Sequence, residues 1–226
     1  MTCWWPQPRL CAEAAGPTPS SQKSGAITME TAYFLYLCKK ETLMTEWEKM
    51  LGGEPYDGND PMVLERLFAN KDRVWRYNQI QPTRFEEREA ALRQMLGRCG
   101  ERPVINAPFY CDYGCNIEVG DRFFANFNFI VLDEARVTIG HDVFIGPNVS
   151  LLTACHPTDP QQRNTRVQWA RPIRIGNNVW IGGSVTVLPG VTIGDGTTIG
   201  AGSVVVSDIP AHSIAVGNPC EVVKKL

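Results

Sequence analysis

The chain has 226 residues, of which 43% are hydrophobic and 20% are charged, and its formal net charge is -2. This composition argues against a disordered chain or a coiled coil, and it provides no broad basic field for nucleic acid. The apolar run near the start, residues 32–38, is far too short to cross a bilayer, and residues 1–25 do not have the pattern of a signal peptide.

The cysteines indicate a reducing compartment. There are 8 of them, but the chain is long and shows no export signal, so a disulfide framework is not expected. Cys111 and Cys115 have the wrong spacing for a zinc knuckle, and no second pair completes one. The sequence therefore predicts reduced thiols, a cytoplasmic location and no bound metal.

Residues 1–43 differ from the rest of the chain. They are rich in turn and linker residues, as in Gly16-Pro17-Thr18-Pro19, and show no sustained helical or strand period. Two interpretations stay open: a disordered extension, or a working protein that begins at Met44. No function is assigned to this segment.

Residues 44–98 are predicted to be helical. A first segment, 44–51, is stopped by Gly52-Gly53. Asp60-Pro61 opens a second, with Asp as the N-cap and Pro at the first helical position. Its apolar residues recur at helical spacing: Val63, Leu67, Val74 and Tyr77. After an interruption at 82–84, a third amphipathic segment covers 85–96.

A repeat of six residues runs through the remainder, from about Val104 to Leu226. One register holds Ile175, Ile181, Val187, Ile193, Ile199 and Val205, and a second register, two residues earlier, holds Ile173, Val179, Val185, Val191, Thr197 and Ser203. Inward aliphatic residues at this period, with glycines at the corners, predict a parallel β-helix in which Ile193 stacks on Ile175. Ordinary hairpins would show a period of two.

The repeat is interrupted once, by a loop at residues 153–171. No hexad occurs between Leu151 and Ile173, and the loop is expected to lack regular structure. Long loops of this kind are usually functional. It contains His156, one of 3 histidines in the chain.

At this point the chain resembles a known family, the hexapeptide-repeat sugar O-acetyltransferases that act on maltose and galactosides. The residues that carry the resemblance are 48–56, 76–78, 111–114, 124–128, His156-Pro157, 175–183, 189–195 and 217–219. It extends over about 44–226. It implies a mainly β fold, a left-handed parallel β-helix with a short N-terminal helical region. It also implies a homotrimer with active sites between subunits, and acetyl transfer from acetyl-CoA to a sugar hydroxyl in one ternary complex.

His156 is the residue to which the resemblance assigns the general base. A sugar hydroxyl is a poor nucleophile near neutral pH, and an imidazole suits the removal of its proton. From the residues alone, a lone histidine is more often a satisfied structural side chain. Its place in the His156-Pro157 motif favours the catalytic role.

On the acceptor side the resemblance points to Asn126, Asp112, Glu134 and Asp57. Asn126 has an alternative role in an asparagine stack inside the β-helix. Glu134 replaces an Asp of some relatives and Asp112 replaces a Ser, which leaves the preferred sugar open. Asp60 competes with Asp57 for the N-terminal position.

On the donor side the resemblance assigns the oxyanion to the backbone N–H of Gly183. Coenzyme A contacts are implied at Ala201, Val206, Ser207 and Lys224, and Trp180, placed at a corner, either walls the pantetheine channel or only packs. Glu221 and Ser207 stand where relatives often carry Arg and Lys. Two basic contacts are therefore lost, and Lys225 is a candidate to compensate.

Proteins with hexapeptide repeats also serve other functions. A zinc carbonic anhydrase needs three converging histidines, and only His156 has a motif here. A xenobiotic or amine acetyltransferase would share the base and the donor, but the helical motif within 46–78 resembles that of the sugar group. A non-catalytic trimeric scaffold has no need of His156 and Asn126, and both are present.

Overall fold

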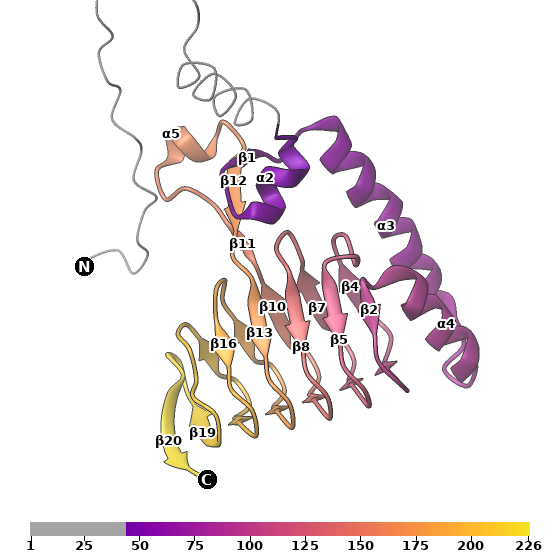
Figure 1. The fold of residues 1–226 in the computed structure, drawn as a ribbon, viewed down its shortest axis with the longest axis vertical. Coiled ribbons are helices and arrows are strands. Elements are labelled where there is room, and N and C mark those ends of the chain that lie inside the picture. The colour runs from indigo at the N-terminus through magenta and orange to yellow at the C-terminus, as the bar shows by residue number, and fades with distance from the viewer. Residues whose placement is uncertain (1–43) are drawn as a thin grey trace, which may run out of the picture. The chain divides into compact units, whose positions relative to one another are not determined.

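The computed structural model describes residues 44–226 (Figure 1). The expectations for residues 1–43 lie outside the described residues. Three helices come first: α2 (Glu46–Gly52), α3 (Pro61–Gln79) and α4 (Phe85–Met95). They match the three expected segments to within a residue or two at each end.

Local chemistry explains where these helices begin and end. Thr45 caps α2 in a capping box with Glu48, and Gly53, at φ +77°, ends it in the left-handed conformation that glycine adopts freely. Asp60 caps α3, because its Oδ1 accepts hydrogen bonds from the N–H groups of Met62 (2.9 Å) and Val63 (3.2 Å). Val63, Val74 and Tyr77 form the buried face of α3.

The rest of the chain winds into a parallel β-helix with three sheets, which confirms the fold predicted from the hexads. Sheet 1 contains β2 (Arg98–Cys99), β5 (Ile117–Val119), β8 (Val137–Ile139), β13 (Ile173–Ile175) and β16 (Thr192–Ile193). Sheet 2 contains β4 (Phe109–Cys111), β7 (Phe129–Leu132), β10 (Ser150–Leu152), β15 (Thr186–Val187) and β18 (Val204–Val205). Sheet 3 contains β3 (Val104–Ile105), β6 (Phe124–Ala125), β9 (Phe144–Ile145), β14 (Trp180–Ile181), β17 (Thr198–Ile199), β19 (Ser213–Val216) and β20 (Glu221–Lys225).

The chain visits the sheets in a fixed order, which defines two corners used below. Each coil passes from sheet 1 to sheet 3, then to sheet 2, and back to sheet 1. The turn from sheet 3 to sheet 2 is called the 3/2 corner, and the turn from sheet 2 to sheet 1 the 2/1 corner. Ile175 pairs with Ile139 below and Ile193 above, as the stacking predicted. The aliphatic hexad positions are buried in one continuous core.

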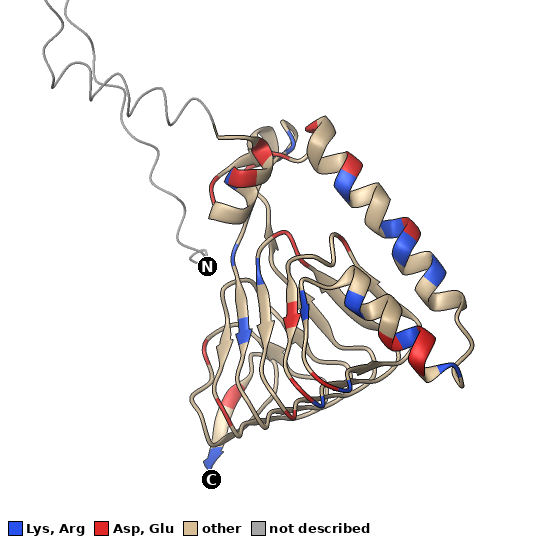
Figure 2. Cartoon of the chain, turned by 45° about the vertical axis from the view of Figure 1, so that its right-hand side comes forward, with Lys and Arg blue, Asp and Glu red and all other residues tan. Residues whose placement is uncertain are grey.

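The outer faces of the sheets differ in polarity. Sheet 1 presents charged and polar side chains, among them Arg98, Glu118 and Arg174. Sheet 3 presents an apolar ladder, defined here as Val104, Phe124, Phe144 and Trp180, which are aligned in register on successive coils. In Figure 2 the charged positions cluster on α3 and α4, while much of the β-helix ribbon is uncharged.

The loop between β10 and β13 is better ordered than the sequence predicted. It contains β11 (Ala154–Cys155), α5 (Pro160–Arg163) and β12 (Val167–Ala170). β12 pairs antiparallel with β11 and also with β1 (Tyr56–Asp57), so the loop and the N-terminal region share a small sheet (Figure 1). The expectation of an irregular loop was wrong, because strands this short leave no alternation in the sequence.

Two negative observations apply to residues 44–226. None of the helices in this range is long and apolar enough to span a membrane. In the same range, no group of three or more His, Cys, Asp or Glu side chains is arranged to hold a metal ion.

Candidate active site

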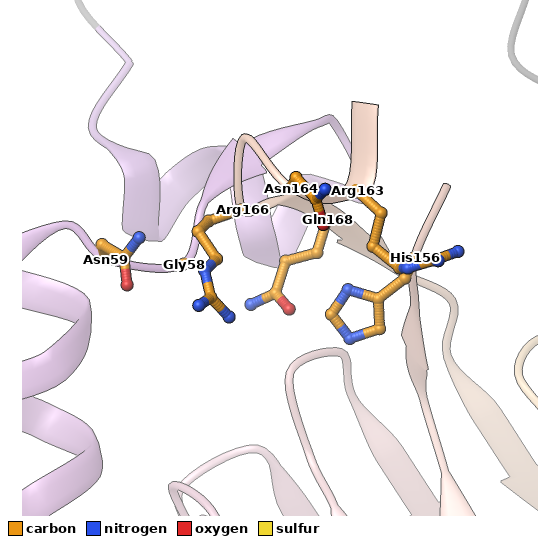
Figure 3. A pocket seen from close by; sticks show the side chains of 7 residues that line it. All are labelled: Gly58, Asn59, His156, Arg163, Asn164, Arg166 and Gln168. Carbon is orange, nitrogen blue, oxygen red and sulfur yellow. The ribbon is translucent and has the colours of Figure 1, made fainter. Parts of the chain in front are cut away.

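His156 lies at the rim of a pocket of about 550 Å³ formed by the loop and the N-terminal region. The lining residues are Gly58, Asn59, His156, Arg163, Asn164, Arg166 and Gln168. In Figure 3, Gln168 lies between His156 and Arg166, and all three side chains extend toward the same open side. Among the described residues the exposed imidazole of His156 has no hydrogen-bond partner, so its nitrogens are free for a ligand.

The antiparallel pairing of β1 with β12 builds the wall opposite His156. Gln168 Nε2 donates to the hydroxyl of Tyr56 at 2.7 Å. A Cβ at Gly58 would lie 2.6 Å from Gln168 Nε2, so a larger residue there would displace this amide from its present position. The pocket therefore depends on contacts between segments that are distant in sequence.

The structure separates Asp57 from its competitor Asp60. Asp57 lies in β1 beside the pocket, where its N–H donates to Glu46 Oε2 at 2.7 Å and its Oδ1 accepts from Asn59 N–H at 2.9 Å. Asp60 is engaged in capping α3. Gly58, which follows Asp57, and Asn59, which precedes Asp60, both line the pocket, so the two carboxylates differ in that the Asp60 side chain is occupied as a helix cap.

Asp112 and Glu134 come together on the 2/1 corner, on the two coils that precede the loop. Burial is the main cause that raises the pKa of both carboxyls, and the Asp112 charge raises the pKa of Glu134 further. Lys71 opposes the shift at Asp112. The pair therefore retains a proton more readily than free carboxyls, and a protonated pair can both donate and accept hydrogen bonds.

Asp133 supports this pair from inside the β-helix, and it was not predicted as a site residue. It is fully buried, and its Oδ1 accepts from the N–H groups of Asp112 and Tyr113, each at 2.9 Å. Its Oδ2 has no hydrogen-bond partner among the described residues. Burial raises the pKa of Asp133 to about 7. Asp133 thus ties the turn that carries Asp112 to the coil that carries Glu134.

Thr153 extends this support to the base of the loop. Its Oγ1 donates to Leu132 O at 2.7 Å and accepts from Ala135 N–H at 3.0 Å. Its carbonyl accepts from Arg171 N–H at 2.9 Å, which closes the loop at its base. These hydrogen bonds therefore fix the carboxyl pair and the base of the loop that carries His156 to the same 2/1 corner.

Asn126 lies on the other corner. It follows β6 at the 3/2 corner, and its Oδ1 accepts from Phe127 N–H at 2.8 Å. The asparagine stack considered for it is formed instead by Asn128 and Asn148, joined at 2.9 Å on the surface. Within one chain, Asn126 and His156 therefore occupy different corners of the β-helix.

Comparison with known proteins identifies the family. The maltose acetyltransferase hexapeptide capping motif matches residues 49–100, and the bacterial transferase hexapeptide family (six repeats) matches residues 172–207. Galactoside O-acetyltransferase of Escherichia coli K12 is 42% identical over 79% of this chain and 88% of its own length. The chain belongs to the maltose and galactoside O-acetyltransferase family of hexapeptide-repeat acyltransferases.

Solved structures agree with this assignment. A maltose O-acetyltransferase from Clostridium difficile 630 superimposes with a TM-score of 0.80 at 46% identity, covering 81% of this chain and 98% of that one. A galactoside acetyltransferase in complex with coenzyme A gives a TM-score of 0.78 at 39% identity, covering 80% and 91%. The protein is thus an acetyltransferase of the hexapeptide family.

The positions that the sequence predicts to contact the acetyl donor lie in three places. Gly183 and Ala201 share the 3/2 corner with Asn126, and neither backbone N–H donates a hydrogen bond within residues 44–226. Val206 and Ser207 follow β18 at the 2/1 corner. Lys224 lies in β20, exposed.

Trp180, Lys225 and Glu221 all lie in strands of sheet 3. Trp180 lies in strand β14 and not at a corner, and 58% of it is exposed on the apolar ladder, so it does not pack into the core. Lys225 donates from Nζ to Ser213 Oγ at 3.2 Å, so its ammonium already has one partner. Glu221 begins β20, where it pairs with Val216.

The sequence named His156 but missed the residues around it. Asn59, Arg166 and Gln168 carry no motif, and they reach His156 only through the pairing of β1 with β12. Asp133 was passed over because a single Asp before Glu134 has no distinguishing spacing. The one available signal was its position directly after a buried strand.

Proposed function

We propose that this acetyltransferase transfers an acetyl group from acetyl-CoA to a sugar hydroxyl, with His156 as the general base. The observation that carries the proposal is the pocket in which the unpartnered imidazole of His156 faces hydrogen-bonding side chains of the family's N-terminal motif and of the loop. Sugars are bound through their hydroxyls, which such amide groups can hold as donors and as acceptors. The coenzyme A complex of the related galactoside acetyltransferase supports acetyl-CoA as the co-substrate.

The reaction follows from the groups present. A nitrogen of His156 removes the proton of the acceptor hydroxyl as its oxygen attacks the thioester carbonyl. The oxyanion that forms on that carbonyl accepts a hydrogen bond from the free N–H of Gly183. Collapse of the tetrahedral intermediate expels the coenzyme A thiolate, and the imidazolium returns a proton to it. The acetyl group passes directly to the sugar, without an acyl-enzyme.

The proposal further assigns binding roles to the remaining site residues. The carboxyls of Asp57, Asp112 and Glu134 and the amide of Asn126 would hold the acceptor. Ala201, Val206, Ser207 and Lys224 would contact coenzyme A, with Trp180 beside the pantetheine arm. The cytoplasm is the expected location, supported by the free state of all five cysteines in the described range.

A homotrimer completes the site. Asn126 and Gly183 lie on the 3/2 corner, whereas His156 and the carboxyl pair lie on the 2/1 corner. One chain cannot bring the two corners together, but the 2/1 corner of one copy can face the 3/2 corner of the next in a ring. The exposed apolar ladder on sheet 3 supports burial of that face against another copy.

The test is release of coenzyme A from acetyl-CoA, measured with maltose, glucose, a thiogalactoside and a small amine as acceptors. We expect sugar-dependent turnover, and kcat lower by about 10²–10⁴ in His156→Ala with KM for acetyl-CoA unchanged. His212→Asn is the matched control: His212 is exposed, lies outside the pocket, and has a left-handed φ that Asn tolerates. Turnover with the amine alone, or a His156→Ala rate above one third of wild type, would overturn the proposal.

A further inference from the structure

Arg166 adopts a backbone conformation that its residue type does not favour. It lies between α5 and β12 with φ +70°, where the chain reverses, and its N–H donates to Arg163 O at 3.1 Å. Glycine occupies this left-handed region without strain, whereas a side chain brings its Cβ against the backbone. Eight other non-glycine residues among those described also have a positive φ, Arg102 and Arg122 included, so any use of the Arg166 side chain must follow from where it points and from what it contacts.

The side chain of Arg166 points into the His156 pocket (Figure 3). Its guanidinium makes no ion pair or hydrogen bond with any of residues 44–226. The other guanidinium of the pocket is engaged, because Arg163 Nη1 donates to the carbonyls of Pro157 and Thr158, each at 3.2 Å. Arg163 therefore stabilises the loop, and the guanidinium of Arg166 is available to bind a ligand.

The surroundings of Arg166 lack a countercharge. No Asp or Glu lines the pocket, and Asp57, the carboxylate just before Gly58, accepts from the N–H of Asn59 and forms no ion pair with Arg166. A planar guanidinium with free N–H groups matches a carboxylate, which it binds through two parallel hydrogen bonds.

We propose that Arg166 selects acceptor sugars that carry a carboxylate on the part of the molecule that is not acetylated. This inference rests on the proposed sugar O-acetyltransferase function and adds a substrate class to it. The carboxylate would sit against Arg166 while a hydroxyl of the same molecule reaches His156. A neutral glycoside would enter the same pocket without this contact.

Two glycosides that differ only at one group test the proposal. The para-carboxyphenyl and para-carbamoylphenyl glycosides of the best sugar have nearly the same shape, but only the first is anionic. We expect wild-type kcat/KM to be about twofold to fivefold higher for the carboxylate, as for one ion pair at an exposed arginine. Arg166→Gln should bring the ratio close to one, and Arg166→Lys should retain part of it.

Matched variants separate charge from backbone strain. Arg166→Gly should lose the preference and raise Tm by about 2–4 °C, because it removes the strain. Arg102 is also an exposed arginine with a left-handed φ (+51°) but lies outside the pocket, so Arg102→Gln should keep the wild-type ratio.

Two results would overturn the inference: a wild-type ratio near one, and an unchanged ratio in Arg166→Gln. If the ratio is unchanged and the KM for acetyl-CoA rises in Arg166→Gln, Arg166 belongs to the donor site. Turnover of the neutral glycoside shows that the proposed function holds in each of these cases. If neither glycoside is acetylated, the proposed function fails and the inference fails with it.

Discussion

At the scale of single residues, the carboxyl of Asp133 links the stability of the fold to pH. Its two accepted N–H bonds hold the Asp112 turn, but burial dominates and raises its pKa to about 7. A carboxyl whose pKa is higher in the folded state binds its proton more tightly there. Its stabilising contribution is present below about pH 4 and is lost as pH rises toward 7.

Asp133→Asn should therefore remove part of the pH dependence of stability. The amide oxygen can accept the same two N–H groups, and the side chain cannot ionise. The measured quantity is the free energy of unfolding of the variant minus that of the wild type. We expect this difference to be more positive at pH 8 than at pH 5, by about 1–4 kcal/mol. Urea unfolding at both pH values measures it. A difference that is equal at both pH values would contradict the assigned protonation.

Some residues of the site could be predicted from the sequence and others could not. His156 was predicted because a rare residue type occurs in a motif on a loop outside the repeat. Gln168 was not, because its role depends on a hydrogen bond to Tyr56, 112 residues earlier. Arg166 has no sequence signal, since its left-handed φ is set by the chain reversal before β12.

At the scale of elements, the corners of the β-helix limit which side chains can occupy them. Gly140 precedes a coil turn, and a Cβ placed there would lie 2.7 Å from the backbone carbon and oxygen of Gly176 on the next coil. The contact is with backbone, so the neighbour cannot rotate away. Gly202 has φ +75° but nothing within 4 Å of an added Cβ.

These two glycines make a matched pair. Gly140→Ala should lower the free energy of unfolding by about 2–3 kcal/mol through the steric clash between coils. Gly202→Ala should cost about 1 kcal/mol through backbone strain alone. Thermal and urea unfolding of both variants measure the costs. Equal costs would mean that coil spacing does not restrict residue size at the Gly140 corner.

The elements also show why the repeat was easier to predict than the loop. The six-residue spacing of Ile175, Ile181 and Val187 places one buried residue on each of the three sheets of a coil. Three such steps return the chain to the first sheet, so the stacking of Ile193 on Ile175 follows from spacing alone. In the loop, β11 and β12 are short and half-buried, and their partner β1 lies in another region of the chain. Pairing between distant short strands leaves no period in the sequence.

At the scale of the whole molecule, the polarity of the outer faces predicts which sheet contacts another copy of the chain. Phe144 is 54% exposed and Trp180 is 58% exposed, next to each other in register on sheet 3. Large apolar side chains aligned in this way on a surface are costly unless a partner covers them. Sheet 1, which carries Glu118 and Arg174, has no such ladder.

Charge placed on the ladder should therefore break the assembly. We expect Phe144→Asp and Trp180→Lys to shift the protein from trimer to monomer in light scattering coupled to size-exclusion chromatography, with loss of acetyl transfer. Thr138→Lys, on the outer face of sheet 1 beside Glu118, should remain trimeric. A ladder variant that stays trimeric and active would remove sheet 3 from the interface.

The central claim, an active site shared between two copies, is tested most directly by complementation. His156→Ala and Asn126→Ala chains carrying different tags are co-expressed, and mixed trimers are isolated through both tags. In a ring of three, any mixture of the two variants has one junction where an intact His156 meets an intact Asn126. The account predicts roughly a third of the wild-type rate per mixed trimer, and no rescue when His156→Ala is paired with the double variant. A rate no higher than that of the single variants would contradict it.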